Sequence, residues 1–415
     1  MARDDGRDPV NPADPRRPVF DKHTTAEGAE AEVRGWHHIR ELLPAPAFLG
    51  RRTTAQAHVV TFEDVFDNGR CRLLLGDLIA LADRDTAALP RLLTLVDEIC
   101  RSLHTAASTT GATAPLSQCR PGLYADRIRR GGRLDAWYLH QDLPLALPGT
   151  HTVLTLGELR HYTFTVNERP LAVDLPAIIA GARRTLNPGG RWATAITQGD
   201  PTEPNIADPL CWLDFEHAGR NTLPGENAIF LWYLMALGGW LVPRYQPDTY
   251  QRTLRLALTP RTAPRVEHCA LDETERHITL RYTWAVEPGR HAALTRALQN
   301  LAASPAAFLN EARAFLTLRI LGVIPPTLLS APDLLLVLIK AAECHDPATE
   351  LTSLFNPTPV PFPPSRSTEW PPCLPLALNP PCARSLFTGG PPWSPARPPV
   401  SAQRSPAPSR RPARP

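Results

Sequence analysis

Lysine is almost absent from this sequence of 415 residues. The chain carries 44 basic residues, and only Lys22 and Lys340 are lysines. A lysine at any given position is therefore improbable by chance. The net charge is +3, and seven of the arginines lie in the segment from Asn356 to the end. The remainder is slightly acidic, so it lacks the basic face that a nucleic-acid-binding domain needs.

Closely spaced cysteines, long apolar runs and an apolar leader are also lacking. None of the eight cysteines stands in a C-x-x-C pair, which excludes the common zinc and redox motifs. The longest apolar run, Ala228 to Val242, is shorter than the about 20 residues of a membrane helix, and we interpret it as a buried helix. The first 18 residues are charged and Pro-rich, unlike a signal peptide. We therefore expect a cytoplasmic chain with reduced thiols and no membrane partner.

Both ends of the chain have compositions that do not support a packed core. Residues 1–17 are rich in Asp, Arg and Pro without periodic apolar positions, which predicts disorder. Residues 356–415 hold 19 of the 47 prolines, which predicts an extended, disordered tail. A tail of this kind can bind an SH3-like partner, although read-through of a frameshifted gene end would have the same composition.

The residues between these ends predict an α+β protein. Hydrophobic residues make up 43% of the chain, enough for a large core. Residues 18–65 alternate short strands with one helix, and the helix is predicted over Ala26–Leu43. Residues 66–355 are predicted to be mainly helical, including the stretch 123–187. The exceptions are short strands at Trp192–Thr197 and Cys211–Phe215 and a hairpin with arms at Arg265–Ala270 and His277–Trp284.

The most informative stretch runs from Ala193 to Gly219. An apolar strand leads into Asp200, Asn205 follows after four intervening residues, and Asp214 ends a second apolar strand. Phosphoryl transfer needs a carboxylate to accept the proton of the attacking hydroxyl. It also needs hard oxygen ligands for the Mg²⁺ that neutralises the triphosphate. The spacing D-x-x-x-x-N, followed by an apolar strand that ends in D-F, is the layout of kinases.

Two motifs extend this observation to a family. QGDPTEPNI resembles the H-G-D-x-x-x-x-N catalytic loop of aminoglycoside phosphotransferases and choline kinases, and LDFEHAG resembles their I-D-F-x-x-A-G metal segment. The resemblance implies a two-lobed protein-kinase-like fold with ATP or GTP as the phosphate donor. It also implies that Asp200 is the catalytic base and that Asn205 and Asp214 bind Mg²⁺. Gln198 stands where the family usually has His. The loop lacks the Lys of protein-serine kinases, which favours a small hydroxylated molecule as acceptor.

Upstream positions complete the predicted nucleotide site. Lys22, on the strand before the first helix, is predicted to bind the phosphates. Its ion-pair partner on that helix is predicted to be Glu30, with Glu27 and Glu32 as alternatives. Only 21 residues precede Lys22, and they contain no Gly-rich loop. We therefore expect residues 18–65 to form a small β-containing N-lobe that is partly missing, and residues 66–355 to form a larger, mainly helical C-lobe.

The last part of the predicted N-lobe resembles a kinase hinge. The segment from Val60 to Val65 is similar to the strand and hinge that hold adenine by backbone hydrogen bonds. Glu63, Asp64 and Val65 are accordingly predicted to bind the nucleotide base.

Other interpretations of the sequence stay open. The missing Gly-rich loop and Gln198 also suit a non-catalytic, kinase-like binding module or a truncated relic of an enzyme. TLNPGGRW, at residues 185–192, resembles a segment of methyltransferases, but no Gly-rich turn of the dinucleotide-binding type precedes it. The charge pattern does not select the acceptor, which is an aminoglycoside, choline, a sugar, a macrolide or another small hydroxylated compound.

Overall fold

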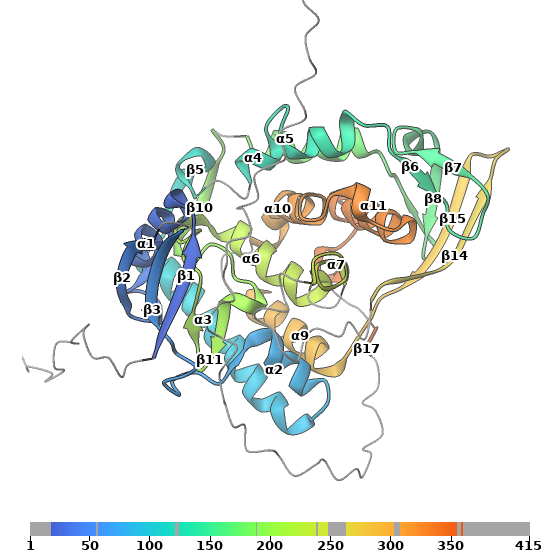
Figure 1. The fold of residues 1–415 in the computed structure, drawn as a ribbon. Helices are drawn as coiled ribbons and strands as arrows, with labels where there is room; N and C mark the ends of the chain where they lie inside the picture. The colour runs from blue at the N-terminus through green and yellow to red at the C-terminus, as the bar shows by residue number, and fades with distance from the viewer. Residues whose placement is uncertain are drawn as a thin grey trace, which may run out of the picture.

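The computed structural model describes residues 18–54, 57–120, 124–187, 189–237, 240–247, 263–302, 308–354 and 358–359. This part of the chain is α+β, as predicted, with helices surrounded by several small sheets (Figure 1). The disorder predicted for residues 1–17 and for nearly all of 356–415 lies outside the described residues. Within the predicted tail, Thr358–Pro359 forms a short strand, β17, which pairs with β16 (Ala285–Val286).

The first sheet is antiparallel and has the strand order β1-β3-β2. Its strands are β1 (Val19–Thr24), β2 (Phe48–Thr53) and β3 (His58–Glu63). Helix α1 (Ala26–Ile39) begins at Thr25, whose hydroxyl accepts a hydrogen bond from the Gly28 amide. The helix buries residues spaced by three or four positions, as an amphipathic helix does. The sequence pattern predicts strands at Pro18–His23, Ala47–Gly50 and His58–Phe62 and a helix over Ala26–Leu43, and the four observed elements agree with these to within four residues at each end.

Two further small sheets carry the segments that the motifs identified. In one, β10 (Arg191–Thr197) lies between β13 (Gly219–Thr222) and β5 (Ala112–Pro115). In the other, β11 (Ile206–Asp208) lies between β12 (Cys211–Trp212) and β4 (Leu73–Leu74). Because β10 precedes the polar loop and the β11–β12 hairpin follows it, the two sheets hold both ends of that loop.

Helices form most of the core. Helix α6 (Leu223–Trp232) is buried on all sides and packs against α10 (Phe308–Gly322). Among the described residues, the other helices of seven residues or more are α2 (Leu75–Ala82), α3 (Leu89–Thr110), α5 (Leu175–Thr185), α9 (Pro288–Ala302) and α11 (Ala331–His345). Shorter ones are α4 (Ala125–Ile128), α7 (Leu241–Tyr245) and α12 (Leu351–Leu354). Within the described ranges, none of the helices is both long and apolar enough to cross a bilayer.

The prediction that residues 123–187 are mainly helical was wrong. This stretch contains four strands, β6 (Pro144–Ala146), β7 (Val153–Thr155), β8 (Thr163–Val166) and β9 (Arg169–Leu171). The predicted hairpin is present as β14 (Arg265–Asp272) and β15 (His277–Thr283), and β8 pairs with β15 in parallel to form the sheet β14-β15-β8-β9. Strands of three or four residues are too short for alternation to be recognised in the sequence.

Candidate active site

The β11–β12 hairpin brings Asn205 and Asp214 to the same end of a sheet. Ile206 pairs with Trp212 across the hairpin, and the Leu213 amide donates to the Asn205 carbonyl over 2.9 Å. Asn205 lies directly before this pair and Asp214 directly after it. The nine positions that separate the two residues in sequence are therefore spanned by one tight hairpin.

Asp200 reaches the same region through a turn that only glycine permits. Thr197, at the end of β10, pairs with Gly219 of β13. Gly199, which follows, has φ of +91°, and a Cβ added to it would lie 2.1 Å from the His217 carbonyl oxygen. The missing side chain allows the loop to lie against the segment between Asp214 and β13.

Gln198 joins the two predicted motifs. Its side chain is fully buried. The Nε2 amide donates to the carbonyls of Leu213 (2.8 Å) and Asp214 (2.5 Å), while Oε1 accepts from the Asp200 amide over 2.9 Å. A single side-chain amide therefore fixes the backbone of Asp200 relative to that of Asp214. Gln can fill this structural role at a position where aminoglycoside phosphotransferases and choline kinases usually have His.

The Asp200 carboxylate is held by Arg319, a residue that the sequence did not identify. Nη2 of Arg319, on α10, donates to Oδ1 of Asp200 over 2.6 Å. The arginine side chain is 2% exposed and that of Asp200 is 22% exposed. Nδ2 of Asn205 donates to the backbone carbonyl of Asp200 over 3.0 Å, and it also donates to Oδ2 of the Asp200 carboxylate over 3.4 Å. Among the described residues, Oδ2 accepts only this long hydrogen bond and is therefore the more weakly engaged of the two carboxylate oxygens.

Lys22 lies between two carboxylates from distant parts of the chain. Its Nζ is 2.7 Å from Oε2 of Glu32 on α1 and 2.9 Å from Oδ1 of Asp214, which is 192 positions away in sequence. The side chains of Lys22 and Glu32 are 14% and 2% exposed, whereas that of Asp214 is 43% exposed. The predicted phosphate-binding lysine and the predicted metal ligand are thus in direct contact.

Glu32 takes the place that we predicted for Glu30. The buried face of α1 includes Ala29, Glu32 and Gly35, whereas Glu30 is exposed and so is the other alternative, Glu27. Glu32 also accepts a hydrogen bond at Oε1 from the Phe215 amide over 3.0 Å. The prediction of Glu30 failed because successive residues of a helix are rotated by about 100°. Glu30 and Glu32 are two positions apart, so they lie on nearly opposite faces, and only Glu32 faces Lys22.

Burial and charge set the protonation of this cluster. Burial raises the pKa of Glu32 to about 7, although the Lys22 ammonium opposes the shift. Burial acts to lower the pKa of Lys22, but Asp214 and Glu32 together raise it above its usual range. Desolvation acts to raise the pKa of Asp214, and the nearby Lys22 lowers it below its usual value. Lys22 and Asp214 are therefore both charged at neutral pH.

The donor atoms in this region suit a magnesium ion that is shared with phosphates. Asp214 has φ of +59°, a left-handed conformation that Asp tolerates better than most residues. Because Nδ2 of Asn205 faces Asp200, its Oδ1 is the atom that a cation would meet. Within the described ranges, no group of three or more His, Cys, Asp or Glu side chains is arranged to hold a metal ion. Mg²⁺ commonly uses only one or two protein carboxylates and takes its other ligands from substrate phosphates and water.

The predicted base-binding residues have other partners. The amides of Glu63 and Asp64 donate to the carbonyls of Ala47 (2.9 Å) and Pro18 (3.0 Å). The Val65 carbonyl accepts from the Cys71 amide over 2.7 Å, and the Val65 side chain is buried. Two of the amides that a nucleotide base would need are therefore already engaged within the chain.

Comparison with known proteins leaves the family open. No protein-family model matches the sequence, and no curated protein matches it. Among solved structures, a match to glucosamine kinase (crystal form B) has a TM-score of 0.32 and 16% sequence identity, over 81% of this chain and 66% of that chain. The aligned part thus spans just under two thirds of that protein. At this level of similarity neither fold nor function is transferred.

Proposed function

We propose that this chain is a phosphotransferase that moves the γ-phosphate of ATP or GTP to a hydroxyl of a small metabolite or antibiotic. The observation that carries the proposal is the convergence of Lys22 of β1, Glu32 of α1 and Asp214 of the loop after β12. A lysine held by a helix glutamate, beside a carboxylate that follows a strand, is the phosphate-binding arrangement of kinases. In this proposal β1–β3 and α1 form a small lobe, and the remaining elements form a larger one.

In this proposal, each residue of the site has a separate role in phosphate transfer. Oδ2 of Asp200 accepts the proton of the acceptor hydroxyl, since Oδ1 is engaged by Arg319. Lys22 binds phosphate oxygens, and Glu32 keeps its ammonium in position. Asn205 and Asp214 hold Mg²⁺, which, when bound, offsets the charge of the transferring phosphoryl group. Most of the rate enhancement then comes from positioning and charge stabilisation.

A second candidate is a kinase-like module that binds a ligand without catalysis. Two observations favour it. Arg319 engages the predicted base, and the Glu63 and Asp64 amides have partners within the chain. A relic of an enzyme would keep the Lys22–Glu32–Asp214 contacts for stability alone.

Thermal unfolding with nucleotide tests whether the site binds. The full chain is measured with Mg²⁺ plus ATP and with Mg²⁺ plus GTP. A ligand at about 100 times its Kd adds roughly 2.7 kcal/mol to stability, enough to raise the midpoint by about three degrees in a chain of this size. The shift is expected to require Mg²⁺ and to disappear in Asp214→Asn. No shift with either nucleotide would contradict the proposal.

Turnover separates the two candidates. Phosphate transfer from the nucleotide that binds is measured against a panel of aminoglycosides, choline, sugars and macrolides. Asp200→Asn is preferred to Asp200→Ala because the amide oxygen still accepts from Arg319. The variant is expected to keep the nucleotide shift and to lose at least about 100-fold in turnover. A nucleotide shift without transfer to any acceptor would favour the non-catalytic module.

A further inference from the structure

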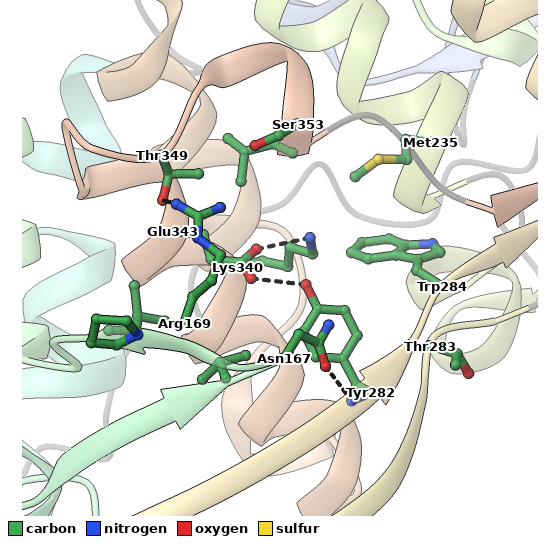
Figure 2. A pocket seen from close by; sticks show the side chains of 14 residues that line it. Asn167, Arg169, Met235, Tyr282, Thr283, Trp284, Lys340, Glu343, Thr349 and Ser353 are labelled. Atoms are coloured by element: carbon green, nitrogen blue, oxygen red, sulfur yellow. Dashed lines mark hydrogen bonds and ion pairs between the residues drawn. The ribbon is translucent and has the colours of Figure 1, made fainter.

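The second lysine of the chain lines a cavity of about 270 Å³. Figure 2 shows the cavity between the β8–β9 hairpin, the end of β15, and the helices α11 and α12. In Figure 1 these elements lie on the opposite side of the molecule from β1–β3 and α1. The cavity is close to the lower end of the volumes at which proteins enclose small organic ligands.

Lys340 is fixed in this cavity by a glutamate and two aromatic rings. It is 5% exposed, and its Nζ lies 2.8 Å from Oε2 of Glu343. The ammonium stands over Trp284 at 4.6 Å from the ring centroid and over Tyr282 at 5.2 Å. The Tyr282 hydroxyl donates to Oε1 of Glu343 over 2.8 Å. The charge therefore occupies one defined position in the cavity wall.

The charges that line the cavity leave it net positive. Lys340 and Glu343 neutralise one another, and Arg169 is the remaining charged lining residue. Nη2 of Arg169, an exposed residue of the β8–β9 hairpin, donates to the Thr349 hydroxyl over 3.5 Å. Because Glu343 offsets the Lys340 charge, Arg169 leaves the cavity with one net positive charge, which attracts an anionic group and repels a cationic one.

Apolar side chains form part of the remaining wall, and the polar side chains of Asn167, Thr283, Thr349 and Ser353 form the other part. Leu171, Met235 and Leu354 line the cavity, and so does the indole of Trp284. A buried ion pair contributes little net stability by itself, because desolvation offsets the attraction. A buried lysine–glutamate pair at the wall of a cavity, in a chain where all but two of the basic residues are arginine, is better explained by a ligand than by stability.

We infer that this cavity binds a small organic anion, with a carboxylate directed to Arg169 and Lys340 and an aromatic or short aliphatic body against Trp284 and Met235. The lining residues, the charge balance and the volume carry this inference. It is independent of the proposed phosphotransferase activity, because neither Asp200 nor Asp214 belongs to the cavity.

Calorimetric titration of the full chain with three matched probes tests the inference. The probes are phenylacetate, 2-phenylethanol and 2-phenylethylamine, which share one body and differ in charge. Phenylacetate is expected to bind at least about tenfold more tightly than the neutral alcohol, the ratio that one charge-assisted hydrogen bond provides. The amine is expected to bind most weakly. Equal affinities, tightest binding of the amine, or no binding of phenylacetate would overturn the assignment.

Two variants locate the site. Arg169→Ala, on the exposed rim, is expected to weaken phenylacetate binding about tenfold without changing the unfolding midpoint. Lys340→Met keeps an unbranched side chain that extends to the position of Cε, removes the ammonium, and is expected to abolish the preference for the anion. Asp214→Asn serves as the matched control, and its phenylacetate affinity is expected to equal that of the parent chain. Unchanged binding in Arg169→Ala would place the anion elsewhere and overturn the proposal.

Discussion

Arg319 of α10 donates a hydrogen bond over 2.6 Å to Oδ1 of Asp200, which is 119 positions earlier in the sequence. The arginine is almost fully buried. Removing one member of such a pair leaves the other charge uncompensated, which typically costs about 3–5 kcal/mol. The ends of β10 and α10 are therefore coupled by one interaction, and its loss should be visible in stability as well as in activity.

Arg319→Met is expected to lower the free energy of unfolding by about 3 kcal/mol in urea titrations. Arg296→Met is a matched control, because Arg296 pairs with Asp97 at 2.7 Å but is 43% exposed. That pair should contribute little. If both variants lost the same stability, the Arg319–Asp200 contact would not be a buried ion pair.

Glu32 and Glu30 offer a test within one helix. Glu32→Gln keeps an oxygen that can accept from the Phe215 amide but removes the charge beside Lys22. In the proposed function this loosens the lysine and weakens the binding of Mg²⁺ plus ATP or GTP by about tenfold, as measured by titration. Glu30→Gln is expected to bind like the parent chain. Equal effects of the two substitutions would show that Lys22 does not depend on Glu32.

Gly35 sets how closely α1 approaches the Asp214–Phe215 segment. A Cβ at Gly35 would lie 1.8 Å from the Phe215 carbonyl oxygen, whereas one at Gly50 meets nothing within 4 Å. Gly35→Ala should therefore destabilise the chain by about 1–3 kcal/mol despite the better helix propensity of alanine. Gly50→Ala should not. A stable Gly35→Ala variant would mean that α1 lies farther from Phe215, and the measurement is again urea unfolding.

The local sequence predicted strands β10 and β12 because their apolar patterns are clear, but it did not predict β11, which lies in the predicted loop. The D-x-x-x-x-N spacing related Asp200 to Asn205, and the apolar strand that follows related Asp214 to them. The hairpin of β11 and β12 explains why Asn205 and Asp214 lie together. The pairing of Lys22 was only partly predictable. An acidic helix carries Glu27, Glu30 and Glu32, and only the position of the sheet determines which of them is buried.

Other features depend on contacts between distant segments. Arg319 sits in an apolar stretch of α10 where no motif marks it, so the available signal was a lone arginine among buried residues. The strands β6–β9 are too short to show alternation, and β8 is held in place by parallel pairing with β15. Tertiary pairing of this kind is not encoded within the strand itself.

Glu226 has an unusual environment next to the loop that carries Asp200. It is 2% exposed on the buried helix α6, and the Thr197 hydroxyl donates to its Oε1 over 2.6 Å. Burial raises the pKa of Glu226 to about 8, and the Asp200 charge adds to the shift. The folded chain therefore keeps this carboxyl protonated at neutral pH.

The consequence is a loss of stability as the pH rises. The unfolded chain releases the Glu226 proton near pH 4.5, whereas the folded chain holds it to about pH 8. Folding binds a proton in this window, so the free energy of unfolding falls with increasing pH, by roughly 1.4 kcal/mol per pH unit at most. Glu226→Gln keeps an acceptor for Thr197 and cannot ionise. Urea titrations between about pH 5 and 8 should therefore show a variant that is increasingly more stable than the parent, with a flatter pH dependence. Parallel pH profiles for the two proteins would mean that Glu226 is ionised in the folded state and that its charge is compensated by a partner.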